Sequence, residues 1–186
     1  MFSCSKTESY PWLSTLDSEI KYKESGRRLM SLDFGLNPLE NPNKNEKVLF
    51  IGIHGGGSLG YEWIYPLQTL DTERTVTFFY RWDDKKCYLK SAEKLIFYLS
   101  KTIKDYPNLK KIILIGHSYG GVLVTSMVEA WNHDILVEIH SIAGPIGSSF
   151  SRGNCNYVPP KDISSKVVFY QWRTQHHLDT AFKGLK

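Results

Sequence analysis

Two glycine-rich segments contain the residues whose types and spacing could carry out chemistry. Residues 54–60 (HGGGSLG) follow the apolar run 48–53, and residues 116–121 (GHSYGG) follow the apolar run 111–115. The second segment fits G-x-S-x-G, a turn between a strand and a helix that exposes a serine hydroxyl above a sheet. It therefore predicts that Ser118 attacks a carbonyl carbon as a nucleophile.

The first segment, taken alone, is compatible with two chemistries. Gly55, Gly57 and Gly60 fit G-x-G-x-x-G, which lets a backbone approach the pyrophosphate of a dinucleotide. Asp83 ends the next predicted strand, about where a ribose-binding acid would lie. His-Gly-Gly-Gly after a strand can equally supply backbone amides that hold an oxyanion. This second interpretation is favoured, because it gives both motifs a role and because Pro66 is expected to interrupt the helix that a dinucleotide loop requires.

Both motifs lie in a pattern of alternating strands and helices. Strands are predicted over 47–53, 75–80, 111–115, 135–142 and 167–172, and helices over 61–70, from a cap at Asp83 or Asp84 to just before Pro107, and over 119–131. Such alternation predicts the α/β class: a three-layer sandwich with a mostly parallel sheet of about five strands and helices on both faces. Residues 1–46 show no sustained periodicity, which predicts an irregular N-terminal extension before a core at 47–186.

With GHSYGG and HGGG in these positions, the chain resembles the α/β-hydrolase superfamily over roughly residues 47–180, specifically its GHSxGG lipase and esterase branches. The resemblance implies an α/β-hydrolase core and cleavage of a carboxylic ester through an acyl-enzyme on Ser118. The substrate would be an acyl lipid, a short-chain ester or a thioester. The amides of Tyr119 and Gly56 would hold the oxyanion, with Gly57 as second choice, and no cofactor or metal is expected.

The resemblance also indicates where the catalytic acid and base should lie. In this superfamily the acid follows a strand and is itself followed by one more strand and the histidine loop. Asp179 is the only carboxylate after the last predicted strand, with Asp162 as the fallback, and His177 or else His176 is the candidate base. Only fourteen residues follow that strand, so the chain is expected to be short at its C-terminus. Either the natural chain continues past Lys186, or the chain is a shortened member with strongly reduced activity.

Aromatic side chains near the two motifs are candidates for substrate binding. Trp82 follows the second predicted strand, and Phe150 and Tyr157 lie in a long loop that could form an acyl-binding wall. His54 either orients the oxyanion loop through hydrogen bonds or is a satisfied core histidine.

A different class of function is the main alternative. A non-catalytic hydrolase-like module that binds a lipid or a partner could share this fold, since a fold does not decide a function. The composition, with 41% hydrophobic and 23% charged residues, is typical of a globular domain. The net charge of +4 is spread along the chain, which argues against a nucleic-acid interface. No apolar run suggests a transmembrane segment, and the oligomeric state is left undefined.

The chain has three cysteines, an odd and sparse set that predicts neither a disulfide framework nor a metal site. Residues 1–4 (MFSC) are similar to the end of a bacterial lipoprotein signal. Two locations follow: the cytoplasm if Met1 is the true start, or the envelope if Cys4 is a lipidated N-terminus.

Overall fold

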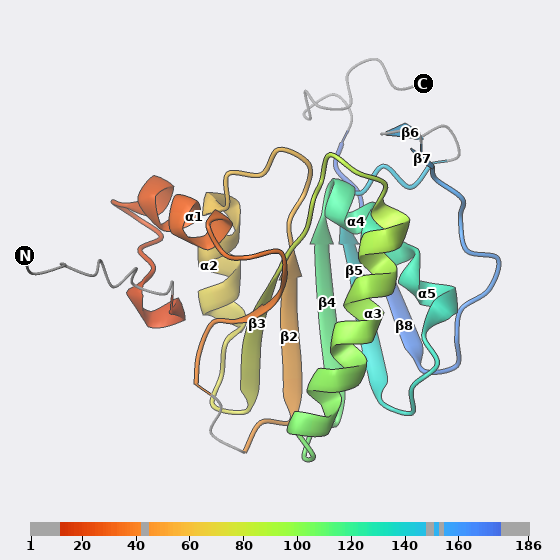
Figure 1. The fold of residues 1–186 in the computed structure, drawn as a ribbon, viewed down its shortest axis with the longest axis horizontal. Coiled ribbons are helices and arrows are strands. Elements are labelled where there is room, and N and C mark those ends of the chain that lie inside the picture. Colours follow the sequence, from red (N-terminus) through yellow and green to blue (C-terminus); the bar gives the residue numbers. More distant parts are fainter. Residues whose placement is uncertain (1–11, 42–44, 148–150, 153–154, 176–186) are drawn as a thin grey trace, which may run out of the picture.

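Six strands form one mixed sheet in the order β1-β3-β2-β4-β5-β8 (Figure 1). The structure, a computed structural model, describes residues 12–41, 45–147, 151–152 and 155–175. The strands of the sheet are β1 (Gly35–Pro38), β2 (Val48–Ile53), β3 (Thr75–Arg81), β4 (Lys111–His117), β5 (Leu136–Ile142) and β8 (Val167–Trp172). A separate two-stranded sheet pairs β6 (Ser151–Arg152) with β7 (Cys155–Asn156). The helices are η1 (Leu13–Thr15), α1 (Tyr22–Met30), α2 (Tyr61–Leu70), α3 (Tyr88–Asp105), α4 (Tyr119–Thr125) and α5 (Met127–Ala130).

The predicted α/β class and mostly parallel sheet are confirmed, and helices flank the sheet on both sides. Five strands are parallel to their neighbours, and β1 alone runs antiparallel, against β3. Alternate side chains of β2 separate the two cores: Leu49 and Ile51 pack with α3, α4 and α5, whereas Phe50 packs with α1 and α2. The arrangement is broadly compatible with a three-layer sandwich.

The prediction that residues 1–46 are irregular is wrong for part of that segment, which contains α1 and the sixth strand β1. These elements are short, and tertiary contacts stabilise them where periodicity gives little signal. Gly26 of α1 lies so close to α2 that an added Cβ would be 2.5 Å from the Tyr61 nitrogen. Leu36 of β1 is paired with Tyr80 of β3.

Two details of the predicted helices are also wrong. Pro66 lies inside α2 and does not interrupt it. A proline there forgoes one backbone hydrogen bond, and burial of Trp63, Ile64 and Leu67 against the sheet offsets that loss. The predicted helix 119–131 divides into α4 and α5 at Ser126, whose hydroxyl donates to the Leu123 carbonyl at 2.6 Å and competes with the helical bonds.

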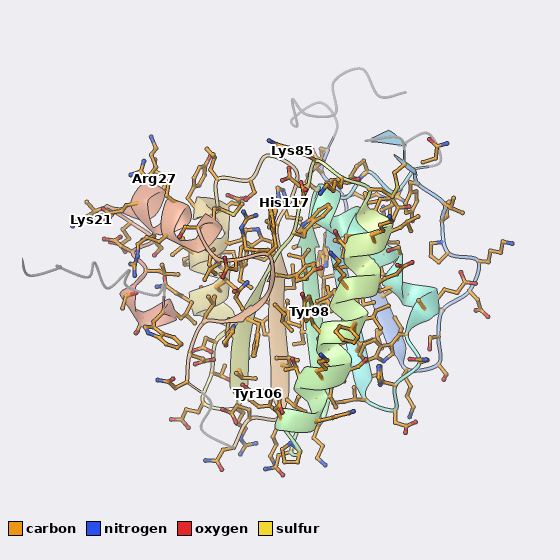
Figure 2. The ribbon with its side chains drawn as sticks, viewed as in Figure 1. Lys21, Arg27, Lys85, Tyr98, Tyr106 and His117 are labelled. Carbon is orange, nitrogen blue, oxygen red and sulfur yellow. A yellow bond between two sulfur atoms is a disulfide. The ribbon has the colours of Figure 1, made fainter. Side chains whose placement is uncertain are left out.

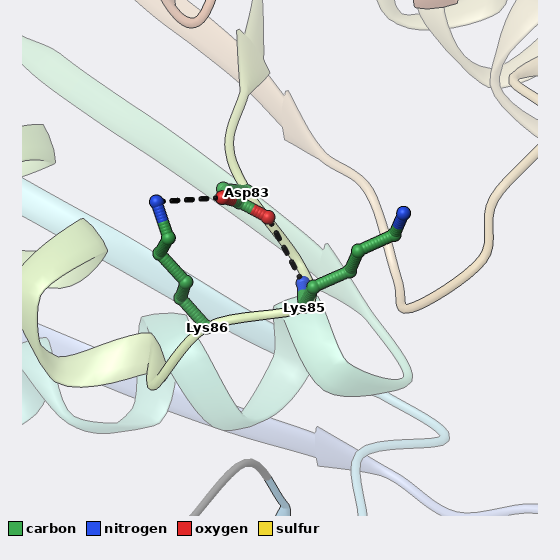
Figure 3. A network of polar contacts seen from close by, with 3 residues as sticks. All are labelled: Asp83, Lys85 and Lys86. Atoms are coloured by element: carbon green, nitrogen blue, oxygen red, sulfur yellow. Dashed lines mark hydrogen bonds and ion pairs between the residues drawn. The ribbon is translucent and has the colours of Figure 1, made fainter.

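Asp83 and Asp84 do not cap α3, which begins four residues later at Tyr88. Asp83 instead forms a tight turn, in which its carboxylate accepts from the Lys85 amide at 3.2 Å and pairs with the Lys86 ammonium at 3.0 Å (Figure 3). Asp84 turns toward the glycine-rich loop.

Cys87 and Cys155 form a disulfide, which the sparse cysteine pattern did not predict. The two residues are 68 positions apart in sequence, and their Cα atoms are 5.3 Å apart. Only the fold brings the start of α3 next to β7, so no local spacing could reveal the pair.

Candidate functional site

The two glycine-rich segments leave the sheet side by side. The chain proceeds from β2 to β3 on one side and reaches β4 on the other, so the strand order reverses between β2 and β4. In open α/β sheets, ligands bind outside the carboxyl ends of the strands at such a reversal, because the loops there diverge and leave a crevice. Residues 54–60 follow β2 and Ser118 follows β4, so both motifs lie at this point.

Ser118 has the strained backbone that its motif predicts. Its φ of 53° and ψ of −118° place a non-glycine residue at positive φ, and such strain gathers at functional sites. We call this sharp turn between β4 and α4 the elbow. A hydrogen bond holds it in place, because the Ser118 amide donates to the Ile142 carbonyl at 2.8 Å. Glycine is required on both sides of the turn: a Cβ on Gly116 would be 2.2 Å from the Gly120 oxygen, and one on Gly120 would be 2.4 Å from the Ile53 oxygen.

The HGGG loop packs directly against this elbow. A Cβ built on Gly55 would be 3.0 Å from the Cβ of Ser118 and 3.0 Å from the His117 carbonyl oxygen. The two motifs, more than sixty residues apart in sequence, are therefore in contact. Gly55 therefore lies directly beside Ser118, next to the two glycines whose amides are the predicted oxyanion donors.

The predicted oxyanion donors differ in their surroundings. The Gly57 amide, at a φ of 68°, donates to the Asp84 carboxylate at 2.6 Å. The Gly56 amide has no acceptor among the described residues. Tyr119 begins α4, and its hydroxyl donates to the Lys86 carbonyl at 3.0 Å. Gly56 thus stays the first choice in the loop, whereas Gly57 is occupied by Asp84.

His54 is fully buried and holds the loop to β3. One ring nitrogen, Nδ1, lies 2.8 Å from the Gly55 carbonyl oxygen, while Nε2 is 2.9 Å from the Arg81 guanidinium and accepts from the Trp82 amide at 3.2 Å. Burial lowers the pKa of His54 to about 4, so the ring is neutral at pH 7. The histidine is therefore a satisfied core residue that also orients the loop, and both of its nitrogens are occupied.

Two of the predicted substrate-binding aromatics are described, and both are buried. Trp82 is 2% exposed, packs on the ring of Tyr119 and donates from its indole nitrogen to the His54 carbonyl at 2.9 Å. Tyr157 is 4% exposed and packs on Tyr88, and burial raises its pKa to about 12. Phe150 lies outside the described residues, so the acyl-binding wall stays a prediction.

The predicted acid and base, Asp179 and His177, lie outside the described residues, as does His176. The fallback acid Asp162 is exposed and lies close to Ser164, whose amide donates to the Val128 carbonyl in α5. This places the segment near the start of β8, at the end of the sheet opposite to the elbow (Figure 1). Asp162 is therefore poorly placed to serve Ser118.

None of the four described histidines forms a hydrogen bond with the Ser118 hydroxyl. His133 is 2.7 Å from the Ser100 hydroxyl, and His140 stacks on Tyr170 in the adjacent strand β8. His117 directly precedes the serine and is half-buried at the carboxyl edge (Figure 2). The described residues thus contain the candidate nucleophile and the candidate oxyanion loop, without a histidine hydrogen-bonded to the Ser118 hydroxyl.

Asp84 and Arg81 are the site residues that sequence reasoning missed. Both belong to the RWDD stretch at the end of β3, and a strand predicted next to β2 must bring its carboxyl end to the same edge as the HGGG loop. That placement is a signal in the sequence, but Asp83 and Asp84 also have the residue type of helix caps, and the sequence predicts that role for them.

No protein-family model matches the chain, and no curated protein matches it. In the described part of the chain, no helix combines the length and the apolar character needed to cross a membrane. No group of three or more His, Cys, Asp or Glu side chains there could hold a metal ion.

Proposed function

We propose that the chain is a serine hydrolase that cleaves a carboxylic ester, either an acyl lipid, a short-chain ester or a thioester. One observation carries the proposal: Ser118 has a strained backbone after β4, and Gly55 of the HGGG loop packs against it. This juxtaposition of a strained serine and a glycine loop serves acyl transfer, because a nucleophile and amide donors must meet at one carbonyl.

The proposed reaction passes through an acyl-enzyme. The Ser118 hydroxyl oxygen attacks the carbonyl carbon, and an imidazole takes its proton. The amides of Gly56 and Tyr119 hold the oxyanion, and its collapse expels the alcohol or thiol, which receives the proton. Water then hydrolyses the ester on Ser118 by the same steps. His177 and Asp179 are proposed as base and acid from the resemblance to α/β-hydrolases.

The surroundings of the loop support preorganised amides. His54 contacts Gly55 on one side and Arg81 and Trp82 on the other, so β3 positions the loop after β2. Donors fixed in this way need no rearrangement when charge develops, and removal of one such donor from an enzyme costs about 10²–10³ in rate.

The dinucleotide alternative is disfavoured by charge. The Asp84 carboxylate accepts a hydrogen bond from the Gly57 amide at 2.6 Å. Gly57 is one of the glycines whose backbone would approach a pyrophosphate. A carboxylate there would repel the ligand. A non-catalytic module that binds a lipid or a partner stays the main alternative, because no described imidazole is hydrogen-bonded to the Ser118 hydroxyl.

Labelling with a fluorophosphonate probe tests the proposal. An activated serine in the full chain becomes phosphonylated, which intact-mass measurement detects as one added group, and Ser118→Ala should remove the labelling. Hydrolysis of p-nitrophenyl esters of graded chain length then defines the acyl preference. A folded wild-type chain that neither reacts with the probe nor hydrolyses any of these esters would favour the non-catalytic module.

A further inference from the structure

A basic groove of about 650 Å³ lies next to the candidate site, between the end of β3 and the first turns of α3. Its charged lining consists of one carboxylate and five cations: Asp83, Arg81, Lys85, Lys86, Lys90 and Lys94. The whole chain has a formal net charge of only +4. The lining of this groove alone therefore carries a formal charge of +4, as much as the net charge of the whole chain.

Three of these cations are available to a ligand. The Asp83 carboxylate is paired with Lys86, and Arg81 is bound to the Met30 carbonyl and to His54. The ammonium groups of Lys85, Lys90 and Lys94 form no ion pair with any described residue. Lys85 extends away from the Asp83–Lys86 pair (Figure 3).

Two of these lysines lie on the same face of α3. Lys90 and Lys94 are four residues apart on α3, so they lie on one face of the helix and repel each other. A group with two or more negative charges would offset that repulsion, and phosphate oxygens accept strong charge-assisted hydrogen bonds from ammonium groups. The aromatic rings of Phe34 and Tyr98, which also line the groove, offer an apolar surface to the rest of such a ligand.

The groove shares a wall with the elbow. Trp82 lines the groove, and its ring centroid is 5.0 Å from that of Tyr119, the residue after Ser118. Lys86 also lines the groove, and the Lys86 carbonyl accepts a hydrogen bond from the Tyr119 hydroxyl. Lys85 lies at the same edge of the molecule as His117, whereas Tyr98 lies further along α3 (Figure 2). A ligand in the groove would therefore have one end near the nucleophile.

We propose that this groove binds a phosphorylated group of the ester substrate, and this inference rests on the proposed hydrolase function. The group belongs either to a phospholipid headgroup or to the phosphorylated thiol of a soluble thioester. Both present phosphate oxygens to Lys85, Lys90 and Lys94 while the acyl carbonyl lies at Ser118.

Binding of inorganic pyrophosphate tests the groove without any need for turnover. The full-length variant Lys85→Gln/Lys90→Gln/Lys94→Gln is compared with Lys104→Gln/Lys110→Gln/Lys166→Gln, which loses the same charge at exposed positions outside the groove. Calorimetric titration should show affinity about tenfold weaker in the groove variant and unchanged in the control. Equal affinities in the two variants, or no binding by the wild type, would overturn the proposal.

Hydrolysis assays then distinguish substrate binding in the groove from the chemical step at Ser118. For butyryl-coenzyme A or for phosphatidylglycerol vesicles, the groove variant should raise KM with kcat unchanged, and the substrate that responds identifies the source of the phosphate. Hydrolysis of neutral p-nitrophenyl butyrate should be unaffected. An equal KM rise for the neutral ester overturns the groove assignment. A third outcome is that pyrophosphate binding depends on the groove but the chain hydrolyses neither butyryl-coenzyme A nor phosphatidylglycerol nor p-nitrophenyl butyrate. That outcome would contradict the hydrolase proposal and leave the phosphate-binding groove supported.

Discussion

The two halves of the central sheet differ in how one face is covered. Under α1 and α2, the side chains of β2 and β3 are buried: Phe50 is 1% exposed and Phe79 is 0% exposed. On the same face of β5 and β8, Ile142, Tyr170 and Trp172 are 36%, 41% and 55% exposed. We call β2 and β3 the covered half and β5 and β8 the open half.

This difference matches what each half contributes to the candidate site. The covered half supplies the HGGG loop, which buried His54 and Asp84 hold in place. The open half ends where the acid and base are predicted, beyond the described residues. Preorganised groups need a rigid support, so the half that carries the proposed oxyanion loop is the one packed on both faces.

The largest effect is expected at the elbow. Ser118→Ala should lower esterase activity by about 10³ or more, because the proposed nucleophile is removed. Thermal unfolding should change by less than about 1 kcal/mol, since a strained serine contributes little packing. His140→Asn, in the open half, is the matched comparison and should leave kcat within about twofold. A comparable loss in His140→Asn would show that the open half takes part in the chemistry.

Substitution of two aromatic residues that lie at paired positions across the sheet allows a direct comparison of the two halves. Phe79 of β3 and Tyr170 of β8 are linked across the sheet through Gly52, Ile115 and His140. Phe79→Ala should lower the free energy of unfolding by about 3–5 kcal/mol, because it leaves a cavity in a packed core. Tyr170→Ala should lower it by about 1 kcal/mol or less. Urea unfolding measures both, and equal losses would mean that the open face is covered in solution.

The disulfide links the start of α3 to the segment that leads to β8, since Cys87 precedes α3 and Cys155 lies in β7. Replacing both cysteines by serine should lower the free energy of unfolding by about 3 kcal/mol, because the unfolded chain gains freedom. Urea unfolding with and without reductant provides the control: reductant should destabilise the wild type and leave the variant unchanged. A wild type indifferent to reductant would contradict the pairing.

The smallest effect is the pH dependence that His54 confers. Its pKa is about 4 in the folded chain and 6.5 in its unperturbed state, so between these values the unfolded chain binds more protons. The stability from this group is present above pH 6.5 and is lost as the pH falls toward 4, by about 2–3 kcal/mol.

Urea unfolding of the wild type and His54→Asn between pH 4 and 7 isolates this contribution. Burial raises the pKa of Glu40 to about 7, so Glu40 favours the folded state below pH 4.5 and acts in the opposite sense as the pH rises. That effect is common to both proteins and cancels in their difference. The half-buried His140 should contribute a smaller slope in the same direction as His54, because burial lowers its pKa too. Identical slopes in the wild type and His54→Asn would contradict the assignment.

Elements with long apolar runs could be predicted from the sequence, and those that depend on neighbours could not. The strands at 48–53, 75–81, 111–117, 136–142 and 167–172 lie within two residues of their predicted bounds, because each is a run of mainly apolar residues in the sequence. β1 and α1 were missed, because four and nine residues give little periodic signal. The segment after β3 differs from its prediction, because Asp83 and Asp84 have the residue type of helix caps while their partners are Lys86 and Gly57.

The sequence by itself determined the alternation of strands and helices and the placement of each glycine motif directly after a strand. Local spacing is sufficient for this, since hydrophobic period and glycine position act within a few residues. Only the tertiary structure decided that Asp84 occupies the Gly57 amide, that Cys87 meets Cys155 and that scattered lysines line one groove. Each of these contacts joins residues through the packing of separate elements, and no short-range pattern in the chain specifies which of them will meet.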